Sequence, residues 1–314
     1  MTSWLPFQSP SVLAPAGAEA AALQALSLVL IAGATLIFAG VMVLLVLALR
    51  QRQKRTVPTA WWILGGGIGF PVVVLSGLLL YSTARTAGLE RPLADPPLVV
   101  GVTGRLWWWE VRYRDPASGH EVVLANELRL PVGRPAQIAL GSADVIHSFW
   151  VPELGGKRDL VPGRINHLVI TPLRSGVYRG ECAEYCGVQH AKMALPVVVM
   201  PAEAFAAWLA AQALPASPPG TGPAKAGEQA FRAQGCTACH TVRRLNERVN
   251  RGPDLTHVAS RLTLGAGVLR SEPGAAKRWL VGVQALKPGA RMPSYAHLDG
   301  ATLDALSAYL EQLQ

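Results

Sequence analysis

Two long apolar runs lie near the start of the chain. Residues 22–49 are almost wholly apolar, and residues 60–82 form a second run in which Gly65, Gly66, Gly67 and Gly69 precede Pro71. A helix needs about 20 apolar residues to cross the hydrocarbon core of a bilayer, so both runs predict transmembrane helices. Pro71 predicts a kink in the second helix. Trp61 and Trp62 stand at its start, which is typical of a membrane interface.

The charges around these runs predict their orientation. Residues 50–59 hold four Lys and Arg, whereas residues 1–19 hold none and so lack the positive start of a secretory signal. Because cytoplasmic loops are enriched in Lys and Arg, the 50–59 loop is expected in the cytoplasm. Both chain termini are then expected on the periplasmic side of a bacterial inner membrane, with residues 1–21 as a short exposed leader. The chain is thus predicted to be a multi-pass membrane protein.

Beyond a proline-rich hinge at residues 92–97, the pattern changes to short segments in which apolar and polar residues alternate. Turn residues such as Pro131 and Pro162 separate these segments, and many short strands with such turns predict a β-sandwich or barrel over residues 95–202. An Ala-rich helix at 202–211 is expected to close this domain. The expected strands are 98–113, 122–130, 136–140 and 165–171.

A third pattern follows a proline-rich linker at residues 213–224. Residues 226–234 begin an amphipathic helix, and residues 301–313 place leucines and Tyr309 at helical spacing. Residues 225–314 are therefore predicted to form an all-α domain. The expected fold class is a multidomain membrane protein with a two-helix transmembrane hairpin, an all-β domain and an all-α domain.

Composition adds a positive charge to this picture. Half of the 314 residues are hydrophobic, and the formal net charge is +9. Such a charge attracts nucleic acid, anionic lipid or an acidic partner, but the sequence has no nucleic-acid module, so no nucleic-acid partner is expected. The basic residues of the all-α domain are interpreted as a solvated face, or as a surface that steers toward an acidic one. They are Arg243, Arg244, Arg248, Arg251, Arg261, Arg270, Lys277, Arg278, Lys287 and Arg291.

One stretch of the β-rich region carries metal chemistry. Cys182, Cys186, His190 and Met193 follow one another at intervals of four, four and three residues. Thiolate, imidazole and thioether groups are ligands that suit copper, and two Cys in one loop can bridge two metal ions. Met193 argues against zinc, which takes Cys, His and carboxylate. A disulfide-bonded loop and a redox thiol pair remain as alternatives.

Two motifs of this region resemble subunit II of the haem-copper cytochrome c oxidases. They are residues 144–163, which include His147, and residues 180–193, within a likeness that runs from about 101 to 201. The resemblance implies a cupredoxin sandwich with a dinuclear copper centre called CuA. It implies Cys182 and Cys186 as bridges between the coppers, His147 and His190 as ligands to one copper each, and Met193 and the backbone carbonyl of Glu184 as weak outer ligands.

The same resemblance assigns two further roles. The Glu184 carboxylate matches a position that binds magnesium at the border with subunit I. Residues 104–110 resemble an aromatic strand, in which Trp107 matches the residue where electrons enter. Trp108 departs from the family, which usually has Tyr there, and Trp108 and Trp109 are interpreted as core packing.

The all-α domain contains a haem attachment motif. Cys236-Thr-Ala-Cys239-His240 has the C-x-x-C-H spacing, in which both thiols form thioethers to haem c and the His is the proximal axial ligand. The two thiols and the His then lie on one edge of the porphyrin.

Residues 224–314 as a whole resemble class I cytochrome c. The resemblance implies Met292 as the distal axial ligand, and a His/Met pair raises the potential of a haem. It also implies Pro253 as the residue whose carbonyl orients the proximal His. His257 and His297, the rivals of Met292, are interpreted as surface or structural residues.

These resemblances together imply the subunit through which electrons enter a haem-copper terminal oxidase, namely subunit II of cytochrome c oxidase. Oxygen reduction to water and proton pumping then belong to subunit I, and this chain carries no catalytic residue. The implied partners are subunits I and III, a cytochrome c donor and the lipid bilayer. The alternatives are a membrane-anchored copper chaperone or thiol-redox protein that uses Cys182 and Cys186, and the CuA subunit of a nitric oxide reductase.

Overall fold

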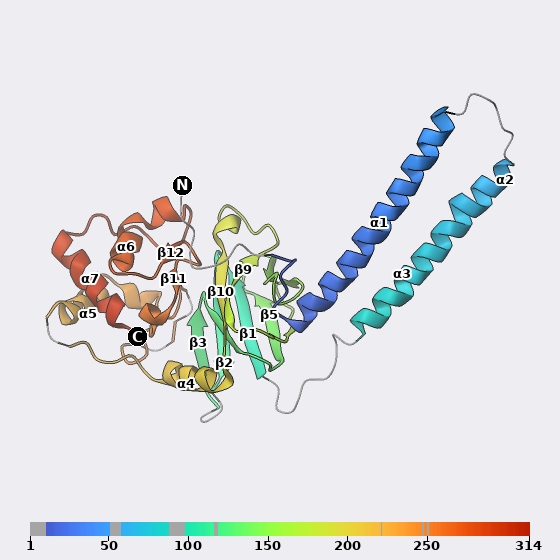
Figure 1. Cartoon of the computed structure of the whole chain (residues 1–314). Helices are drawn as coiled ribbons and strands as arrows, with labels where there is room; N and C mark the ends of the chain where they lie inside the picture. The colour runs from blue at the N-terminus through green and yellow to red at the C-terminus, as the bar shows by residue number, and fades with distance from the viewer. Residues whose placement is uncertain are drawn as a thin grey trace.

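The chain forms a pair of long helices, a β-sandwich and a helical domain that follow one another in space (Figure 1). This arrangement confirms the expected fold class. The predicted hinge at 92–97, residues 1–10 of the predicted leader and residues 51–57 of the predicted basic loop lie outside the described residues. The computed structural model describes residues 11–50, 58–87, 98–115, 119–220, 222–246, 248–249 and 251–314.

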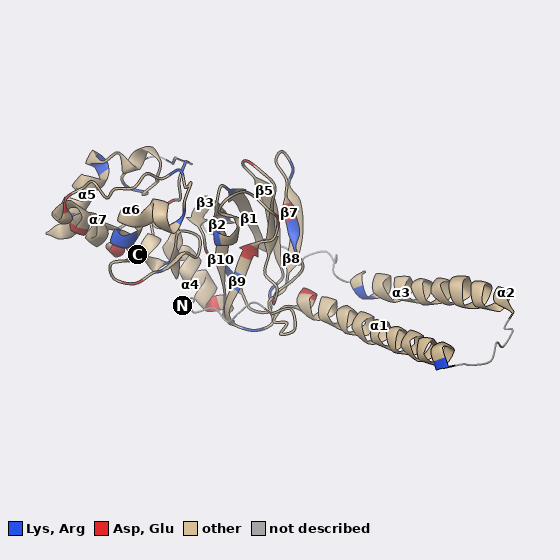
Figure 2. Cartoon of the chain, turned by 90° about the horizontal axis from the view of Figure 1, so that it is seen from above, with Lys and Arg blue, Asp and Glu red and all other residues tan. Residues whose placement is uncertain are grey.

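The two long helices are apolar over almost their whole length. Helix α1 spans Ala18–Arg50, and α2 (Thr59–Trp61), a π-helical segment (Trp62–Gly69) and α3 (Phe70–Thr86) together form the second. Each is long and apolar enough to cross a membrane. Lys and Arg appear only toward the helix ends (Figure 2). The apolar side chains between those ends face outward, as a lipid environment requires.

The second helix departs from regular geometry just before Pro71. Trp62–Gly69 winds as a π-helix, and four glycines of this stretch leave room beside the backbone. Pro71 has no N–H to donate to the carbonyl one turn earlier, which favours a locally widened helix. The kink expected at Pro71 therefore corresponds to a π-helical stretch on its N-terminal side.

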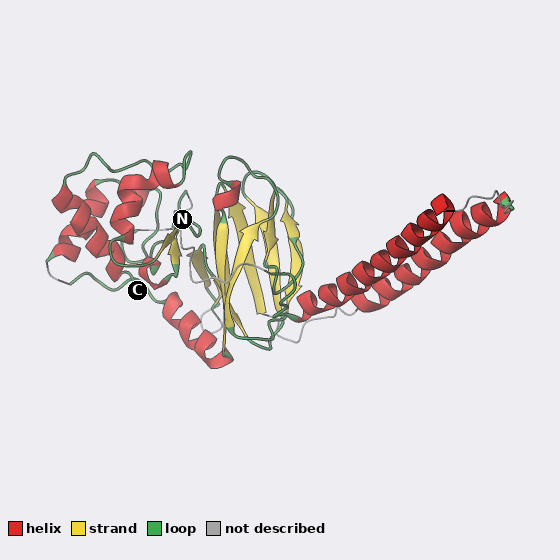
Figure 3. Cartoon of the chain, turned by 45° about the horizontal axis from the view of Figure 1, so that its top comes forward, coloured by secondary structure: helices red, strands yellow, loops and turns green. Residues whose placement is uncertain are grey.

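Residues 98–200 form two five-stranded sheets packed face to face (Figure 3). One sheet has the order β3-β2-β1-β5-β8 and the other β4-β10-β9-β6-β7. The first comprises β1 (Leu98–Arg105), β2 (Trp108–Arg114), β3 (Glu121–Ala125), β5 (Ala136–Ser142) and β8 (Asn166–Ile170). The second comprises β4 (Leu128–Pro131), β6 (His147–Trp150), β7 (Arg158–Leu160), β9 (Gly176–Cys182) and β10 (Ala194–Met200).

Two of the predicted strands are each divided in the structure. The expected strand 98–113 is a tight hairpin, because the chain turns at Leu106 and Trp107 between β1 and β2. The expected strand 122–130 contributes β3 to one sheet and β4 to the other. Asn126, at φ 59°, makes that change of sheet, since Asn adopts the left-handed conformation more readily than most residues.

The core lies between the sheets and is built from the inward residues of each strand. Trp109, Tyr113 and Phe149 are its largest buried side chains, each at most 1% exposed. The end of the predicted leader also joins this core, since Ala16 is 1% exposed and its N–H donates to Glu153 O at 2.6 Å. The expectation of an exposed leader is therefore wrong for its last residues.

Helix α1 is anchored to the sandwich at its first turn. The Glu19 carboxylate accepts hydrogen bonds from the Thr171 N–H and hydroxyl, both at 2.8 Å. A carboxylate is also favourable near a helix N-terminus. These contacts fix the angle at which the membrane pair leaves the sandwich (Figure 1).

The helical domain follows α4 (Ala202–Ala213) and consists mainly of α5 (Pro223–Ala233), α6 (Ala275–Leu286) and α7 (Gly300–Gln312). Gly227 lets α5 and α7 cross closely, because a Cβ there would lie 2.0 Å from Ala305 O. Helix α6 was not predicted. A short hairpin, β11 (Thr263–Leu264) with β12 (Leu269–Arg270), lies against the sandwich side.

The first residues of the linker between the domains are tied to the helical domain. Leu214 O lies 2.9 Å from His257 Nε2, and the Ala216 N–H donates to Arg243 O at 3.0 Å. His257 is 5% exposed and its other ring nitrogen lies 2.7 Å from Gln314 O. This histidine is thus structural, in agreement with one of the two roles considered for it.

Candidate functional site

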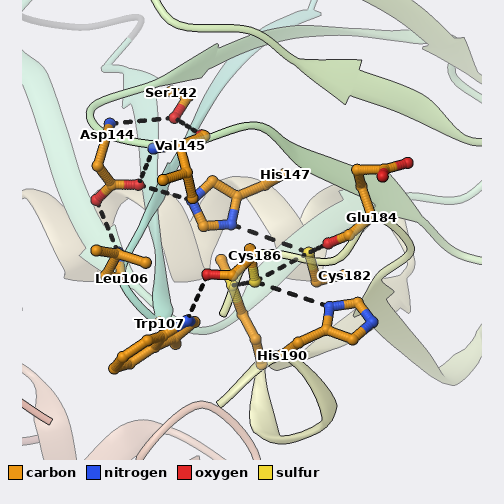
Figure 4. Close-up of polar contacts among 11 residues, drawn as sticks. Leu106, Trp107, Ser142, Asp144, Val145, His147, Cys182, Glu184, Cys186 and His190 are labelled. Atoms are coloured by element: carbon orange, nitrogen blue, oxygen red, sulfur yellow. Dashed lines mark hydrogen bonds and ion pairs between the residues drawn. The ribbon is translucent and has the colours of Figure 1, made fainter. Parts of the chain in front are cut away.

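Two strands and one loop of the sandwich bring sulfur and imidazole side chains together at one end. His147 begins β6, Cys182 ends β9, and Cys186, His190 and Met193 follow on the loop that leads to β10 (Figure 4). His147, Cys182, Cys186 and Met193 are 0, 6, 4 and 1% exposed. Gly104 makes room for the first of these, because a Cβ there would lie 2.7 Å from the His147 ring.

The donor atoms form two groups around the pair of sulfurs. Cys182 Sγ lies 3.7 Å from Cys186 Sγ. The Cys182 sulfur is 3.9 Å from His147 Nδ1 and 3.2 Å from Glu184 O. The Cys186 sulfur is 3.7 Å from His190 Nδ1 and 3.9 Å from Met193 Sδ. In Figure 4 the two imidazoles approach the sulfurs from opposite sides.

These spacings fit metal coordination. Ligand atoms at tetrahedral bonds of about 2.0–2.3 Å lie roughly 3.3–3.8 Å apart, and the separations here, 3.2–3.9 Å, are close to that range. Two sulfurs between two imidazoles, with a thioether on one side and a carbonyl on the other, are donors that suit a pair of copper ions. A disulfide requires sulfurs about 2.05 Å apart, so a disulfide-bonded loop does not describe Cys182 and Cys186 at 3.7 Å.

The protonation of the site favours metal binding. The hydrogen bond from Cys186, followed by that of His147, lowers the pKa of the Cys182 thiol to about 3, although burial opposes this shift. The Cys182 thiolate in turn raises the pKa of Cys186. Burial lowers the pKa of His147, but hydrogen bonds to Asp144 and Cys182 outweigh it and raise the pKa. One thiolate therefore forms readily, as a thiolate ligand requires.

Asp144 orients the histidine of this group. Its Oδ1 lies 2.8 Å from His147 Nε2, so the carboxylate accepts that N–H and Nδ1 faces the sulfurs. The other carboxylate oxygen accepts the Leu106 N–H at 2.8 Å. A carboxylate behind a ligand His is a common support of metal sites. No role was predicted for Asp144 from the sequence, although a carboxylate three residues before His147 could have indicated a partner for that imidazole.

A cavity of about 830 Å³ lies in the helical domain and is closed by the sandwich. Cys236, Cys239, His240 and Met292 all line it, as haem attachment and two axial ligands require. Helix α7 and the 251–265 segment provide further apolar walls. The residues present therefore fit a covalently held haem c.

The histidine of this cavity is held in one tautomer. His240 Nδ1 donates to Pro253 O at 2.8 Å, which leaves Nε2 to face the cavity as a ligand. Burial lowers the pKa of His240, so the imidazole is neutral. Gly252 passes directly over the ring, where a Cβ would lie 2.8 Å from Cε1. Met292 Sδ accepts a hydrogen bond from Trp279 Nε1 at 3.3 Å, while the exposed His297 does not line the cavity.

Residues of the sandwich complete the cavity wall. Arg105, Trp107, Trp108 and Asp144 all line it from the copper-site side. Trp109 is buried in the core as expected, but the same interpretation is wrong for Trp108, which is half-buried. Trp108 lies instead under the Arg105 guanidinium, 5.5 Å from its ring centroid. Strand patterns do not show which side of a domain meets a neighbour, so the sequence carried no signal for these contacts.

Trp107 connects the two sites. Its indole N–H donates to Cys186 O at 2.8 Å, and its side chain lines the cavity. Glycines on both sides pack near the ring: a Cβ on Gly187 would lie 3.1 Å from it and one on Gly289 3.8 Å. Figure 4 shows the indole between the cysteine loop and the helical domain.

Two of the basic residues interpreted as solvated are in fact buried. Arg261 is 8% and Lys287 is 4% exposed. Arg248 lies on the surface and pairs with Glu121 of the sandwich at 3.0 Å. One residue of the basic face therefore contacts an acidic residue of the sandwich, while the expected steering toward an acidic surface stays a prediction.

These features define a membrane-anchored redox protein with a cupredoxin metal site and a cytochrome c domain. The model of the family "Cytochrome C oxidase subunit II, periplasmic domain" matches residues 115–201, and that of "Cytochrome c" matches residues 224–314. The chain belongs to the cytochrome c oxidase subunit II family, and its two domains imply CuA and haem c.

Relatives extend this likeness over most of the chain. The cytochrome c oxidase subunit 2 of Bacillus subtilis is 31% identical over 257 residues, which cover 77% of this chain and 71% of that protein. The one of Alkalihalophilus pseudofirmus is 32% identical over 225 residues, or 72% of this chain. That match spans 64% of the relative's length, slightly less than two thirds.

A solved structure is similar to part of the chain. The periplasmic domain of subunit II of cytochrome oxidase of Bradyrhizobium japonicum is 32% identical. The match covers 39% of this chain and 96% of the chain in that structure, and its TM-score is 0.35.

Proposed function

We propose that this chain carries electrons from a reduced cytochrome c into a haem-copper oxidase, whose subunit I reduces oxygen to water and pumps protons. The observation that carries the proposal is the position of Trp107, which is hydrogen-bonded to Cys186 and also lines the cavity of Cys236, Cys239 and His240. The bound copper pair and haem c supply the one-electron chemistry.

The chain's own residues hold these groups with little freedom to move. Cys182, Cys186, His147 and His190 would hold the copper pair, and Met193 and the Glu184 carbonyl would be its weak outer donors. These donors lie on or between strands of one sheet, so they change position little between oxidation states. Cys236 and Cys239 attach the haem, and His240 with Met292 are its axial ligands.

The roles of Trp107 and Pro253 follow from their contacts. Trp107 is the residue through which electrons pass between the haem cavity and the copper loop, because its ring fills the space between them. The Pro253 carbonyl fixes His240 through the Nδ1 hydrogen bond.

The exposed face of the copper loop is proposed to meet subunit I. The Glu184 side chain points outward, so its carboxylate is available to a magnesium ion shared with that subunit. With residues 50–59 in the cytoplasm, both redox domains lie on the periplasmic side of the inner membrane. Subunit III is the further expected partner.

A copper chaperone fits the site less well. A protein that hands over its metal needs accessible thiols, whereas Cys182 and Cys186 are 6 and 4% exposed. Nor does a chaperone or thiol-redox protein require the haem motif at Cys236–His240.

Purification of the protein from membranes in mild detergent tests the proposal. We expect a haem c absorption band, a near-infrared band of a mixed-valence copper pair, two coppers per chain and a co-purifying multi-helix haem subunit. The complex should consume oxygen with reduced cytochrome c. One labile copper without a partner would favour the chaperone, and turnover with nitric oxide but not oxygen would favour the reductase.

A further inference from the structure

Lys287 is a buried lysine at the junction of the two soluble domains. It follows α6 and is 4% exposed. Its Nζ donates to Trp107 O at 2.7 Å, to Lys192 O at 2.7 Å and to Gly265 O at 3.0 Å. An ammonium group has three protons to donate, and these three carbonyls accept them all.

The three acceptors belong to segments that are far apart in the sequence. Trp107 lies on the β1–β2 turn, Lys192 on the loop of the copper site, and Gly265 on the β11–β12 turn of the helical domain. Burying an ammonium group is unfavourable unless it is hydrogen-bonded. The contacts therefore hold only when both domains are in place.

Other contacts hold the same part of the copper loop from the helical domain. Lys192 Nζ donates to Leu286 O at 2.7 Å. The Ala194 N–H donates to Ala266 O at 3.0 Å. Both residues flank Met193, so the helical domain holds this ligand segment on either side.

These contacts form one continuous path between the sites. Cys186 O accepts from the Trp107 indole, and Trp107 O accepts from Lys287, which also holds the wall of the haem cavity at Gly265. Lys287 itself lines that cavity. It therefore contacts the haem side and the copper side at once.

We propose that Lys287 is a positioning residue that locks the helical domain onto Trp107 and the 192–194 segment, so that electrons pass between the two cofactor sites from one docked arrangement. This inference rests on the proposed function. It assigns Lys287 no contact with either metal, because its partners are backbone carbonyls.

The test compares Lys287→Met in the complete oxidase with Lys277→Met, a matched control on the exposed side of α6, where Lys277 pairs with Asp304. The haem is reduced by a light pulse, and the rate at which the copper band then changes is recorded. Small misplacements of reacting groups can cost up to about 100-fold in rate, so we expect Lys287→Met to slow transfer by roughly 10- to 100-fold. Lys277→Met should transfer at the wild-type rate.

Two further measurements separate positioning from a general structural role. The haem and near-infrared copper bands should be unchanged in Lys287→Met. Amide hydrogen exchange should increase at Ala194, whose N–H crosses to Ala266 O, but not at Cys182, whose N–H donates to Met193 O inside the sandwich. Lys287→Arg, which keeps a charged donor, should recover part of the rate.

The possible results distinguish failure of the Lys287 inference from failure of the proposed function. A wild-type transfer rate in Lys287→Met, or loss of its copper band, overturns the inference and leaves the proposed function intact. Absence of transfer from haem to copper in the wild-type protein overturns the proposed function itself.

Discussion

The copper site and the haem cavity are built in opposite ways. The donors of the copper site come from one domain, and the atoms His147 Nδ1, Cys182 Sγ and Cys186 Sγ lie within 4.8 Å of one another. The haem cavity has a volume of about 830 Å³, and its walls come from two domains. Cys239, one of its attachment residues, is exposed.

The two sites therefore hold their redox groups in different ways. The sheet hydrogen bonds that hold β6, β9 and β10 also hold the copper ligands, so the site depends on one fold. The haem cavity depends on a neighbour, because Trp107 and Trp108 close it from the sandwich. A change in the copper ligands should therefore remain local, whereas loss of a sandwich indole that lines the haem cavity should reach the haem.

The largest expected effect is that of Cys186→Ser. We expect complete loss of the near-infrared copper band with an unchanged haem c spectrum, because the hydroxyl cannot bridge two coppers and the haem ligands lie in the other domain. Absorption spectroscopy and metal analysis of the purified protein provide the measurement. An unchanged copper band would refute the bridging role, and a lost haem band would refute the independence of the copper site.

A smaller effect is expected for Asp144→Asn. The neutral amide is a weaker acceptor than a carboxylate and has only one acceptor oxygen for the His147 and Leu106 N–H groups. Loss of such a carboxylate partner commonly lowers metal affinity by about 10- to 100-fold. Copper titration against a competing chelator measures the change. Asp159→Asn, on β7 away from the donor atoms, is the control. Equal copper affinity in both variants would show that Asp144 does not support the site.

The smallest effect is expected for Trp108→Ala. This substitution lies in the sandwich, and its effect is measured on the reduction potential of the haem. Loss of the indole admits water beside the haem cavity, and a wetter site stabilises the more highly charged oxidised form, so the potential should fall on the order of tens of millivolts. Redox titration of the haem band measures it, with Ile165→Ala, 63% exposed, as the control. An unchanged potential would mean that the sandwich does not contribute to the haem environment.

The sequence predicted the elements that form continuous apolar runs and the site residues that stand at fixed spacing within one segment. The two apolar runs predicted the two long helices because they differ so clearly from their surroundings. The intervals between Cys182, Cys186, His190 and Met193 predicted that these side chains meet, since they share one loop. His147 was placed with them through the resemblance of its motif, which is information that no local pattern contains.

The turns inside the strands and the contacts between the domains could not be predicted from the sequence, because they depend on segments that are far apart in the chain. The turn at Leu106–Trp107 and the change of sheet at Asn126 interrupt runs of β-forming residues that look continuous. Lys287 looked like any solvated lysine, because its acceptors are backbone carbonyls, and every residue has one. Trp108 lies on a strand whose neighbour is another domain, which no strand pattern identifies.

The tied linker has a consequence for kinetics. Leu214 and Ala216 hold the helical domain next to its acceptor, so the donor is always present at a high effective concentration. In the proposed function, electron flow inside the chain is therefore a first-order process that needs no diffusional encounter. Screening by salt affects only the meeting with an outside carrier, which finds the Trp107 face already covered and must deliver its electron to the haem domain.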